Sequence, residues 1–167
     1  MKFIGIIPAR YASSRFPGKA LFVIEGKTMI QRVYEQAKKS NVLSELYVAT
    51  DDTGIENHVK KFGGQVLMTS PQHTCGTERC LEAFRIINQE NKYTTEDVII
   101  NIQGDEPLIN PEQIDLVASC FKSSKVEIAT LVRKLDNQDD LISPNVIKVV
   151  CDNYKKAMYF SRSPIPY

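Results

Sequence analysis

The sequence predicts an α/β protein with a doubly wound, mostly parallel sheet of the Rossmann-like kind. Short runs rich in Val and Ile alternate with segments of helical periodicity along the 167 residues, which is typical of parallel strands joined by crossover helices. The first run, residues 3–7, is apolar and interrupted only by a glycine, as expected of a buried strand. The sequence contains no repeat, low-complexity segment or linker, so we expect one domain.

Each element is predicted from its own local pattern. Strands are expected at about residues 2–8, 45–50, 65–68, 97–103, 127–133 and 145–151. Apolar residues spaced three or four apart predict helices over residues 30–37, 55–62, 80–87 and 114–121. Gly63 is expected just beyond the end of the second helix, and Asn110 is expected to cap the fourth, with Pro111 in its first turn.

Composition limits the partners and the compartment. A formal net charge of +1 lacks the broad excess of one sign that nucleic-acid and membrane-surface proteins usually carry. No run is long and apolar enough to cross a bilayer, so we expect a cytoplasmic protein that binds neither nucleic acid nor membrane. The four cysteines have no spacing typical of zinc or redox sites, and we expect free, buried thiols at Cys75, Cys80, Cys120 and Cys151.

The loop after the first strand is the strongest candidate for a ligand site. Residues 8–19 contain the permanent cations Arg10, Arg15 and Lys19 and no acid. Guanidinium groups pair with phosphate oxygens, lysine supplies a compact charge, and Gly18 allows close approach of the backbone. The loop therefore predicts a diphosphate or triphosphate ligand, although its spacing fits neither the Gly-rich dinucleotide fingerprint nor the P-loop. A solvated basic loop is the alternative interpretation.

A carboxylate follows the fourth expected strand. Asp105 lies in the sequence Gln-Gly-Asp-Glu-Pro over residues 103–107, and one carboxylate together with substrate phosphates suits Mg²⁺. Asn101 and Gln103 are polar within an otherwise apolar strand, which is costly unless they are paired or face a ligand. Ligands of such sheets bind beyond the carboxyl ends of the strands, so the loops after the first and fourth strands are the places to look. A solvated turn is the alternative interpretation.

Three further polar segments have ordinary structural explanations. Residues 73–79 lead into the third helix, where free amides could bind an anion or the edge of a base, although a capped helix start is the default. Asp52 is ambiguous, since it can simply cap the second helix. His58, beside Lys60 and Lys61, is expected to be solvated. No Ser/His/Asp or Cys/His arrangement supports nucleophilic catalysis.

Several segments in the same order together resemble one family. Residues 6–19, 75–79 and 103–107 are similar to segments of the 3-deoxy-manno-octulosonate (Kdo) cytidylyltransferases, also called CMP-Kdo synthetases, and residues 145–150 and 159–162 continue the match. The resemblance implies a nucleotidyltransferase fold. It also implies transfer of CMP from CTP to the anomeric hydroxyl of Kdo, with release of pyrophosphate, for lipopolysaccharide biosynthesis. A sialate-type cytidylyltransferase and a nucleotide-binding fragment without turnover are the alternatives.

The resemblance also implies residue roles. Four catalytic residues are expected, three cations that hold the triphosphate and one acid that holds Mg²⁺: Arg10, Arg15, Lys19 and Asp105. Contacts with the nucleotide are expected from Ala9, Arg10, Lys19, Cys75, Gly76 and Thr77. Contacts with the sugar acid are expected from Arg15, Gln103 and Arg162, the last pairing with the carboxylate of Kdo.

Two features depart from the family pattern. Cys75 stands where Ser is usual, which weakens the expectation of a hydroxyl hydrogen bond at this position. The chain ends at Tyr167, whereas family members continue, so residues 1–167 are expected to be the nucleotide-binding part of a C-terminally truncated protein. The missing part would supply another metal-binding acid, most of the sugar pocket and the contacts of a homodimer. The small-molecule partners are expected to be CTP and Kdo.

Overall fold

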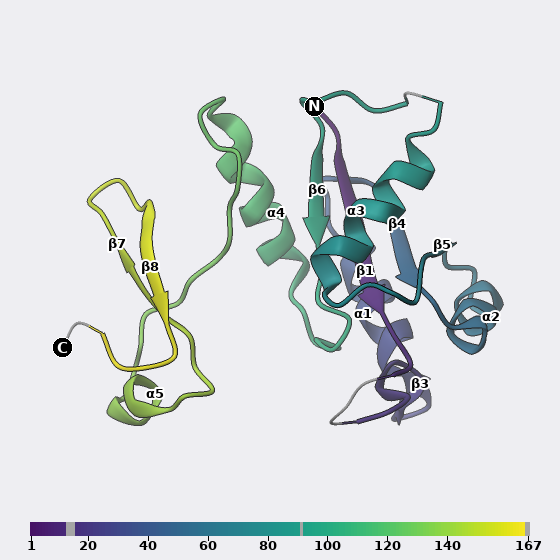
Figure 1. Cartoon of the computed structure of the whole chain (residues 1–167), viewed down its shortest axis with the longest axis horizontal. Helices are drawn as coiled ribbons and strands as arrows, with labels where there is room; N and C mark the ends of the chain where they lie inside the picture. The colour runs from purple at the N-terminus through teal and green to yellow at the C-terminus, as the bar shows by residue number, and fades with distance from the viewer. Residues whose placement is uncertain (13–15, 91, 166–167) are drawn as a thin grey trace. The chain divides into compact units, whose positions relative to one another are not determined.

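The structure is a computed structural model that describes residues 1–12, 16–90 and 92–165. The chain forms two compact units, Met1–Ala129 and Thr130–Tyr167, where the sequence had predicted a single domain (Figure 1). Arg15, one of the expected phosphate-binding cations, lies outside the described residues.

The first unit is built on a four-stranded parallel sheet in the order β5-β4-β1-β6 (Figure 1). Its strands are β1 (Phe3–Ala9), β4 (Leu43–Thr50), β5 (Val66–Met68) and β6 (Val98–Asn101). The central strand β1 pairs with β4 as far as Ala9 opposite Thr50, but with β6 only as far as Ile6 opposite Asn101. Four of the six predicted strands are therefore confirmed in this sheet, within a few residues at their ends.

Helices cover both faces of the sheet, which confirms the doubly wound fold. Three of them, α1 (Met29–Ala37), α2 (Thr53–Lys61) and α4 (Pro111–Ser119), share one core with Ile7 and Ala9 of β1. The remaining face packs α3 (Gly76–Ile87) against Ile4 and Ile6. Since neighbouring residues of a strand point to opposite faces, the apolar run of β1 contributes to both cores at once.

The predicted helix ends are largely confirmed. The side chains of Asp52 and Asn110 cap α2 and α4, each accepting a backbone N–H, and Pro111 is in the first turn of α4. Gly63 follows α2 with a φ of 79°, a conformation that glycine adopts without a Cβ penalty. Cys75 occupies the capping position of α3 without a side-chain hydrogen bond.

Short elements complete the first unit. A turn of 3-10 helix, η1 (Lys19–Leu21), follows the basic loop and leads into the hairpin β2 (Val23–Ile24) and β3 (Lys27–Thr28). A second such turn, η2 (Cys120–Lys122), extends α4.

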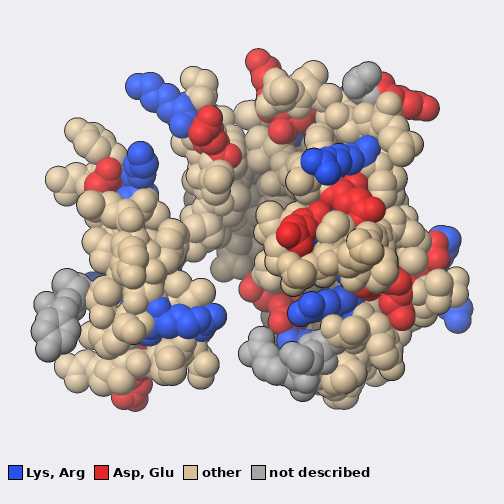
Figure 2. Space-filling model, in the orientation of Figure 1, with Lys and Arg blue, Asp and Glu red and all other residues tan. Residues whose placement is uncertain are grey.

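Acidic and basic side chains are interspersed over the face seen in Figure 2, as the small net charge leads one to expect.

The structure corrects two strand predictions. The second unit contains α5 (Gln138–Ile142) and an antiparallel pair, β7 (Lys148–Cys151) and β8 (Ala157–Ser161). The strand predicted at 145–151 therefore pairs antiparallel with β8 and not in the parallel sheet. Residues 127–133 form no strand, and Ile128 is 92% exposed. A β-branched composition favours a strand only where other residues cover it, so the pattern alone was misleading there.

A buried lysine holds the second unit together. Lys148 is 3% exposed, and its Nζ donates to the carbonyls of Ser143, Val146 and Arg162 at 2.6, 2.9 and 2.7 Å. All three ammonium protons thus have acceptors, which offsets the cost of removing the charge from water. The side chain of Arg162 donates in turn to the carbonyl of Pro144 at 2.8 Å.

The cysteines and the helices also test the compositional expectations. Cys75, Cys80, Cys120 and Cys151 are free, as predicted. Only Cys80 is buried: Cys120 is partly exposed and Cys75 and Cys151 are exposed, so the expectation of burial is wrong for these three. Burial raises the pKa of the Cys80 thiol to about 12. Among the described residues, no helix combines the length and apolar character needed to cross a membrane.

His58 is not the solvated residue that the sequence suggested. Its Nε2 lies 2.7 Å from Oγ1 of Thr28, and its ring packs edge-on against Phe62. The Thr28 hydroxyl accepts the backbone N–H of Gln31 at the start of α1, so its own proton is available to a neutral imidazole. Burial, and then the charge of Lys61, hold the pKa of His58 below its usual value of 6.5.

We therefore predict that His58 makes folding sensitive to acid. Because its pKa is lower in the folded than in the unfolded state, the unfolded state binds more protons, and stability is lost as the pH falls through 6.5 towards the folded pKa. His58→Gln keeps an acceptor for Thr28 but does not titrate. Between about pH 7.5 and pH 5.5, thermal unfolding should show a Tm drop about 2 °C smaller in the variant than in the parent chain. Equal drops would contradict this role.

Candidate functional site

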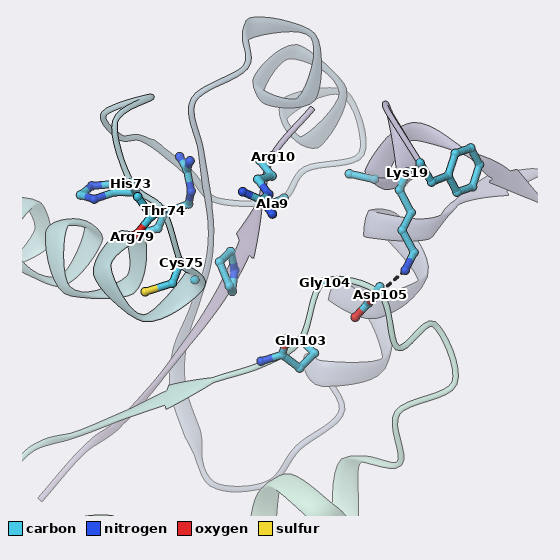
Figure 3. A pocket seen from close by; sticks show the side chains of 14 residues that line it. Ala9, Arg10, Lys19, His73, Thr74, Cys75, Arg79, Gln103, Gly104 and Asp105 are labelled. Atoms are coloured by element: carbon cyan, nitrogen blue, oxygen red, sulfur yellow. Dashed lines mark hydrogen bonds and ion pairs between the residues drawn. The ribbon is translucent and has the colours of Figure 1, made fainter. Parts of the chain in front are cut away.

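A cavity of about 510 Å³ opens in the first unit where its parallel strands end (Figure 3). Its walls come from the end of β1 with the loop that follows, from the loop before α3, and from the turn after β6. The described residues that line it are Pro8, Ala9, Arg10, Phe16, Lys19, Ala20, His73, Thr74, Cys75, Gly76, Arg79, Gln103, Gly104 and Asp105. The loops after the first and fourth predicted strands thus line one cavity at the edge of the sheet where the sequence predicts a ligand.

Pro8 explains why the sheet opens at this point. The N–H of Ile102 donates to the carbonyl of Ile6 at 2.9 Å, and Pro8 is the next residue of β1 that faces β6. Proline has no N–H, so the ladder between the two strands cannot continue. The turn after β6 then leaves the sheet, and the space beside the end of β1 becomes the cavity.

Two glycines allow the start of α3 and the turn after β6 to pack on Pro8. A Cβ on Gly104 would lie 2.7 Å from the Pro8 carbonyl oxygen, and one on Gly76 would lie 3.2 Å from the Pro8 ring. The φ of Gly104 is not positive, so this residue is required for close approach and not for an unusual backbone conformation. The Cys-Gly and Gln-Gly-Asp segments thus meet at a single residue.

The turn after β6 brings Asp105 to the basic loop. Nζ of Lys19, the first residue of η1, lies 2.6 Å from Oδ2 of Asp105 (Figure 3). The two side chains are 37% and 51% exposed, and pairs this open to water contribute only about 0–1 kcal/mol to stability. Arg10 lines the same cavity from the end of β1. The site therefore presents two cations and a carboxylate. The contact between Lys19 and Asp105 is easily exchanged for contacts with a ligand.

Two carboxylates of α3 fix the loop before it. Glu78 accepts the backbone N–H of Thr74 at 3.0 Å and the hydroxyl of Thr74 at 3.1 Å. These hydrogen bonds keep the pKa of Glu78 below its usual value. Glu82 accepts the N–H of Ser70 at 2.8 Å and contacts Nε2 of His73, and both interactions lower the pKa of Glu82. Glu78 thereby anchors a helix start that Cys75 leaves without side-chain capping.

The structure brings most of the predicted site residues together. Those that line the cavity are Ala9, Arg10, Lys19, Cys75, Gly76, Gln103 and Asp105. Thr77 is exposed in the first turn of α3 and is not among the described lining residues. Arg162 belongs to the second unit, where its side chain donates to the carbonyl of Pro144.

Several lining residues were not predicted, and Arg79 is the most informative. It is 3% exposed and donates to Thr69 and Asp51. The sequence offered one signal for its burial: Arg79 directly precedes Cys80, which belongs to the apolar stripe of α3. An arginine next to a buried face needs polar partners. The partners themselves lie in other segments and could not be found from helical spacing.

The donor set near Asp105 fits Mg²⁺ only together with a ligand. Among the described residues, no group of three or more His, Cys, Asp and Glu side chains is arranged to hold a metal. Asp105 is half exposed and lies on the cavity beside Gln103, so it offers one carboxylate to an open space. Mg²⁺ commonly uses one or two carboxylates, retained waters and substrate phosphates, and this arrangement suits it.

The parallel sheet, with a basic loop and a carboxylate turn at its carboxyl edge, has the architecture of an α/β nucleotidyltransferase. The family model for cytidylyltransferases matches residues 4–167, so the chain belongs to the cytidylyltransferase family.

Individual relatives agree with this assignment. The chain is 58% identical to the 3-deoxy-manno-octulosonate cytidylyltransferase of Parabacteroides distasonis and 55% identical to that of Fusobacterium nucleatum, in both cases over its whole length. It spans 65% and 66% of the lengths of these two proteins. The predicted resemblance to the Kdo cytidylyltransferases is confirmed.

Two solved structures share this fold. A CMP:2-keto-3-deoxy-manno-octonic acid synthetase complexed with CTP matches all of this chain and 66% of its own, with a TM-score of 0.90 and 40% identity. A 4-diphosphocytidyl-2C-methyl-D-erythritol synthase, at 18% identity, matches 71% of this chain and 53% of its own with a TM-score of 0.54 and shares the fold.

Proposed function

We propose that the chain binds CTP in the cavity and serves the transfer of CMP to Kdo, with release of pyrophosphate. The observation that carries the proposal is that Arg10, Lys19 and Asp105 line one cavity, in a fold that superimposes on a CTP-bound synthetase with a TM-score of 0.90. The names of the relatives support Kdo as the acceptor in preference to a sialate.

The proposed reaction is an in-line displacement at the α-phosphorus. The anomeric oxygen of Kdo forms a bond to this phosphorus, the bond to the bridging oxygen breaks, and the hydroxyl gives its proton to solvent water. Negative charge grows on the leaving pyrophosphate and on the non-bridging oxygens. Arg10 and Lys19, which line the cavity, are proposed to stabilise that charge, and Arg15, outside the described residues, is proposed to assist them. No covalent intermediate with the protein is required.

Asp105 would hold Mg²⁺, which when bound neutralises charge on the phosphate oxygens. In the structure Lys19 occupies that carboxylate, so we propose that it exchanges Asp105 for the phosphates when the nucleotide binds. The weak, exposed ion pair makes this exchange inexpensive.

The remaining contacts divide between the nucleoside and the acceptor. We propose that Ala9, Cys75 and Gly76, with Thr77 beside them, hold the cytidine. Gln103 and Arg162 are proposed for the sugar acid, since an amide and a guanidinium suit its hydroxyls and carboxylate. The family resemblance further supports a cytoplasmic, homodimeric protein of lipopolysaccharide biosynthesis.

The proposed function is tested by following pyrophosphate release from CTP and Mg²⁺ with either Kdo or N-acetylneuraminate. Release is expected with Kdo and not with N-acetylneuraminate. Release that depends on N-acetylneuraminate would assign the sialate-type reaction instead. CTP binding without release with either acid would overturn the transfer and leave nucleotide binding as the activity of this chain.

Lys19→Ala is expected to weaken CTP binding about tenfold or more and CMP binding less than about threefold, because the lost contact is to the outer phosphates. Isothermal titration with both nucleotides measures the difference. Lys27→Ala is the matched control. Nζ of Lys27 lies 2.6 Å from Oε2 of Glu35, and neither residue is among the described residues that line the cavity. Equal losses for both nucleotides would contradict the placement of the triphosphate.

Asp105→Asn is expected to remove most of the effect of Mg²⁺ on CTP binding, from about tenfold tightening to less than about twofold. Titrations with and without Mg²⁺ measure this, and the Tm should stay near that of the parent chain because the ion pair is exposed. Glu106→Gln changes the neighbouring exposed carboxylate, which is not among the described lining residues, and should keep the Mg²⁺ effect. A full effect in Asp105→Asn would place the metal elsewhere.

A further inference from the structure

Arg79 is a buried charge in the wall of the cavity. It is 3% exposed, its Nη1 donates to Oγ1 of Thr69 at 2.6 Å, and its Nη2 donates to Oδ2 of Asp51 at 2.9 Å. A guanidinium in such a position is costly unless it has a counter-charge and acceptors, and removing one partner of a buried pair leaves the other uncompensated. Both contacts are therefore important for the conformation of Arg79.

The partners of Arg79 lie at the ends of two neighbouring strands. Asp51 follows the last residue of β4, and Thr69 follows the last residue of β5. Both the N–H and the hydroxyl of Thr69 donate to the carbonyl of Thr50, at 2.8 and 3.1 Å, and Thr50 is fully buried. The acceptors of Arg79 are thus fixed by the sheet itself, which makes the guanidinium a rigid link between the sheet and the first turns of α3.

This link determines where one end of the cavity lies. The backbone N–H of Arg79 contacts the carbonyl of Cys75 at 3.4 Å, and residues 73–76 form the adjoining wall. Figure 3 shows Lys19 and Asp105 on one side of the end of β1, and Thr74, Cys75 and Arg79 on the other. In the proposed binding of CTP, Lys19 and Asp105 mark the phosphate end of the cavity, and residues 73–76 with Arg79 mark its base end.

We propose that Arg79, held by Asp51 and Thr69, is a positioning residue for the base end of the site. It acts by fixing residues 73–76 against Pro8, and it sets the affinity for the nucleoside part of the ligand without changing the affinity for the phosphates. This rests on the proposed binding of CTP in the cavity. Asp51 and Thr69 thereby become determinants of nucleotide binding, although neither lines the cavity among the described residues.

The test separates the two ends with two probes, CMP for the base end and inorganic tripolyphosphate for the phosphate end. Asp51→Asn retains volume and an acceptor but removes the counter-charge. It is expected to raise the Kd for CMP about tenfold and to change the Kd for tripolyphosphate less than about twofold. The matched control is Asp52→Asn, because Asp52 caps α2, asparagine also caps well, and the described side-chain hydrogen bonds of Arg79 go to Thr69 and Asp51. The control should bind both probes like the parent chain.

A second pair of variants keeps the test decisive if Asp51→Asn folds poorly. Thr69→Ser retains the hydroxyl and should bind CMP like the parent chain, whereas Thr69→Val should weaken CMP about threefold to tenfold. A purely structural role would lower the Tm without changing the ratio of the two Kd values. Equal changes for both probes, or none for CMP, would overturn the proposal. Failure of the parent chain to bind CTP would instead overturn the proposed function.

Discussion

Pro8 is the residue on which the geometry of the candidate site depends. It lies near the end of the central strand, where the lack of an N–H ends pairing with β6 while pairing with β4 continues to Ala9. Its carbonyl and ring then form the surface on which Gly104 and Gly76 pack. One residue without a hydrogen-bond donor thus both opens the sheet and gathers the segments that surround the opening.

Two ion pairs that include residues lining the cavity differ in their exposure to solvent. Arg79 and Asp51 are 3% and 16% exposed, and their geometry is fixed by the strands that carry them. Lys19 and Asp105 are 37% and 51% exposed and have little to lose by separating. A site for a nucleoside triphosphate benefits from this contrast, since a flat base needs a rigid wall and a flexible polyphosphate needs charges that can rearrange.

The sequence was most informative where a pattern is local. The apolar runs predicted the four strands of the sheet, and Asp52 and Asn110 cap helices as their types suggest. Prediction failed where the outcome depends on distant residues: residues 127–133 have strand composition but no strand, and His58 of α2 contacts Thr28, which precedes α1. The partners of Arg79 could not be predicted either, because only the order of β4 and β5 in the sheet brings Asp51 and Thr69 beside α3.

The central position of β1 has a consequence for how the chain folds during synthesis. Residues 3–9 are made first, and their neighbours are residues 43–50 on one side and 98–101 on the other. A ribosome must therefore release about a hundred residues before the second edge of β1 is paired, and such long-range parallel pairing is slow. Until then, a nascent chain that has already paired β1, β4 and β5 leaves the edge of β1 at Ile4 and Ile6 without a partner strand, and such an open edge favours aggregation.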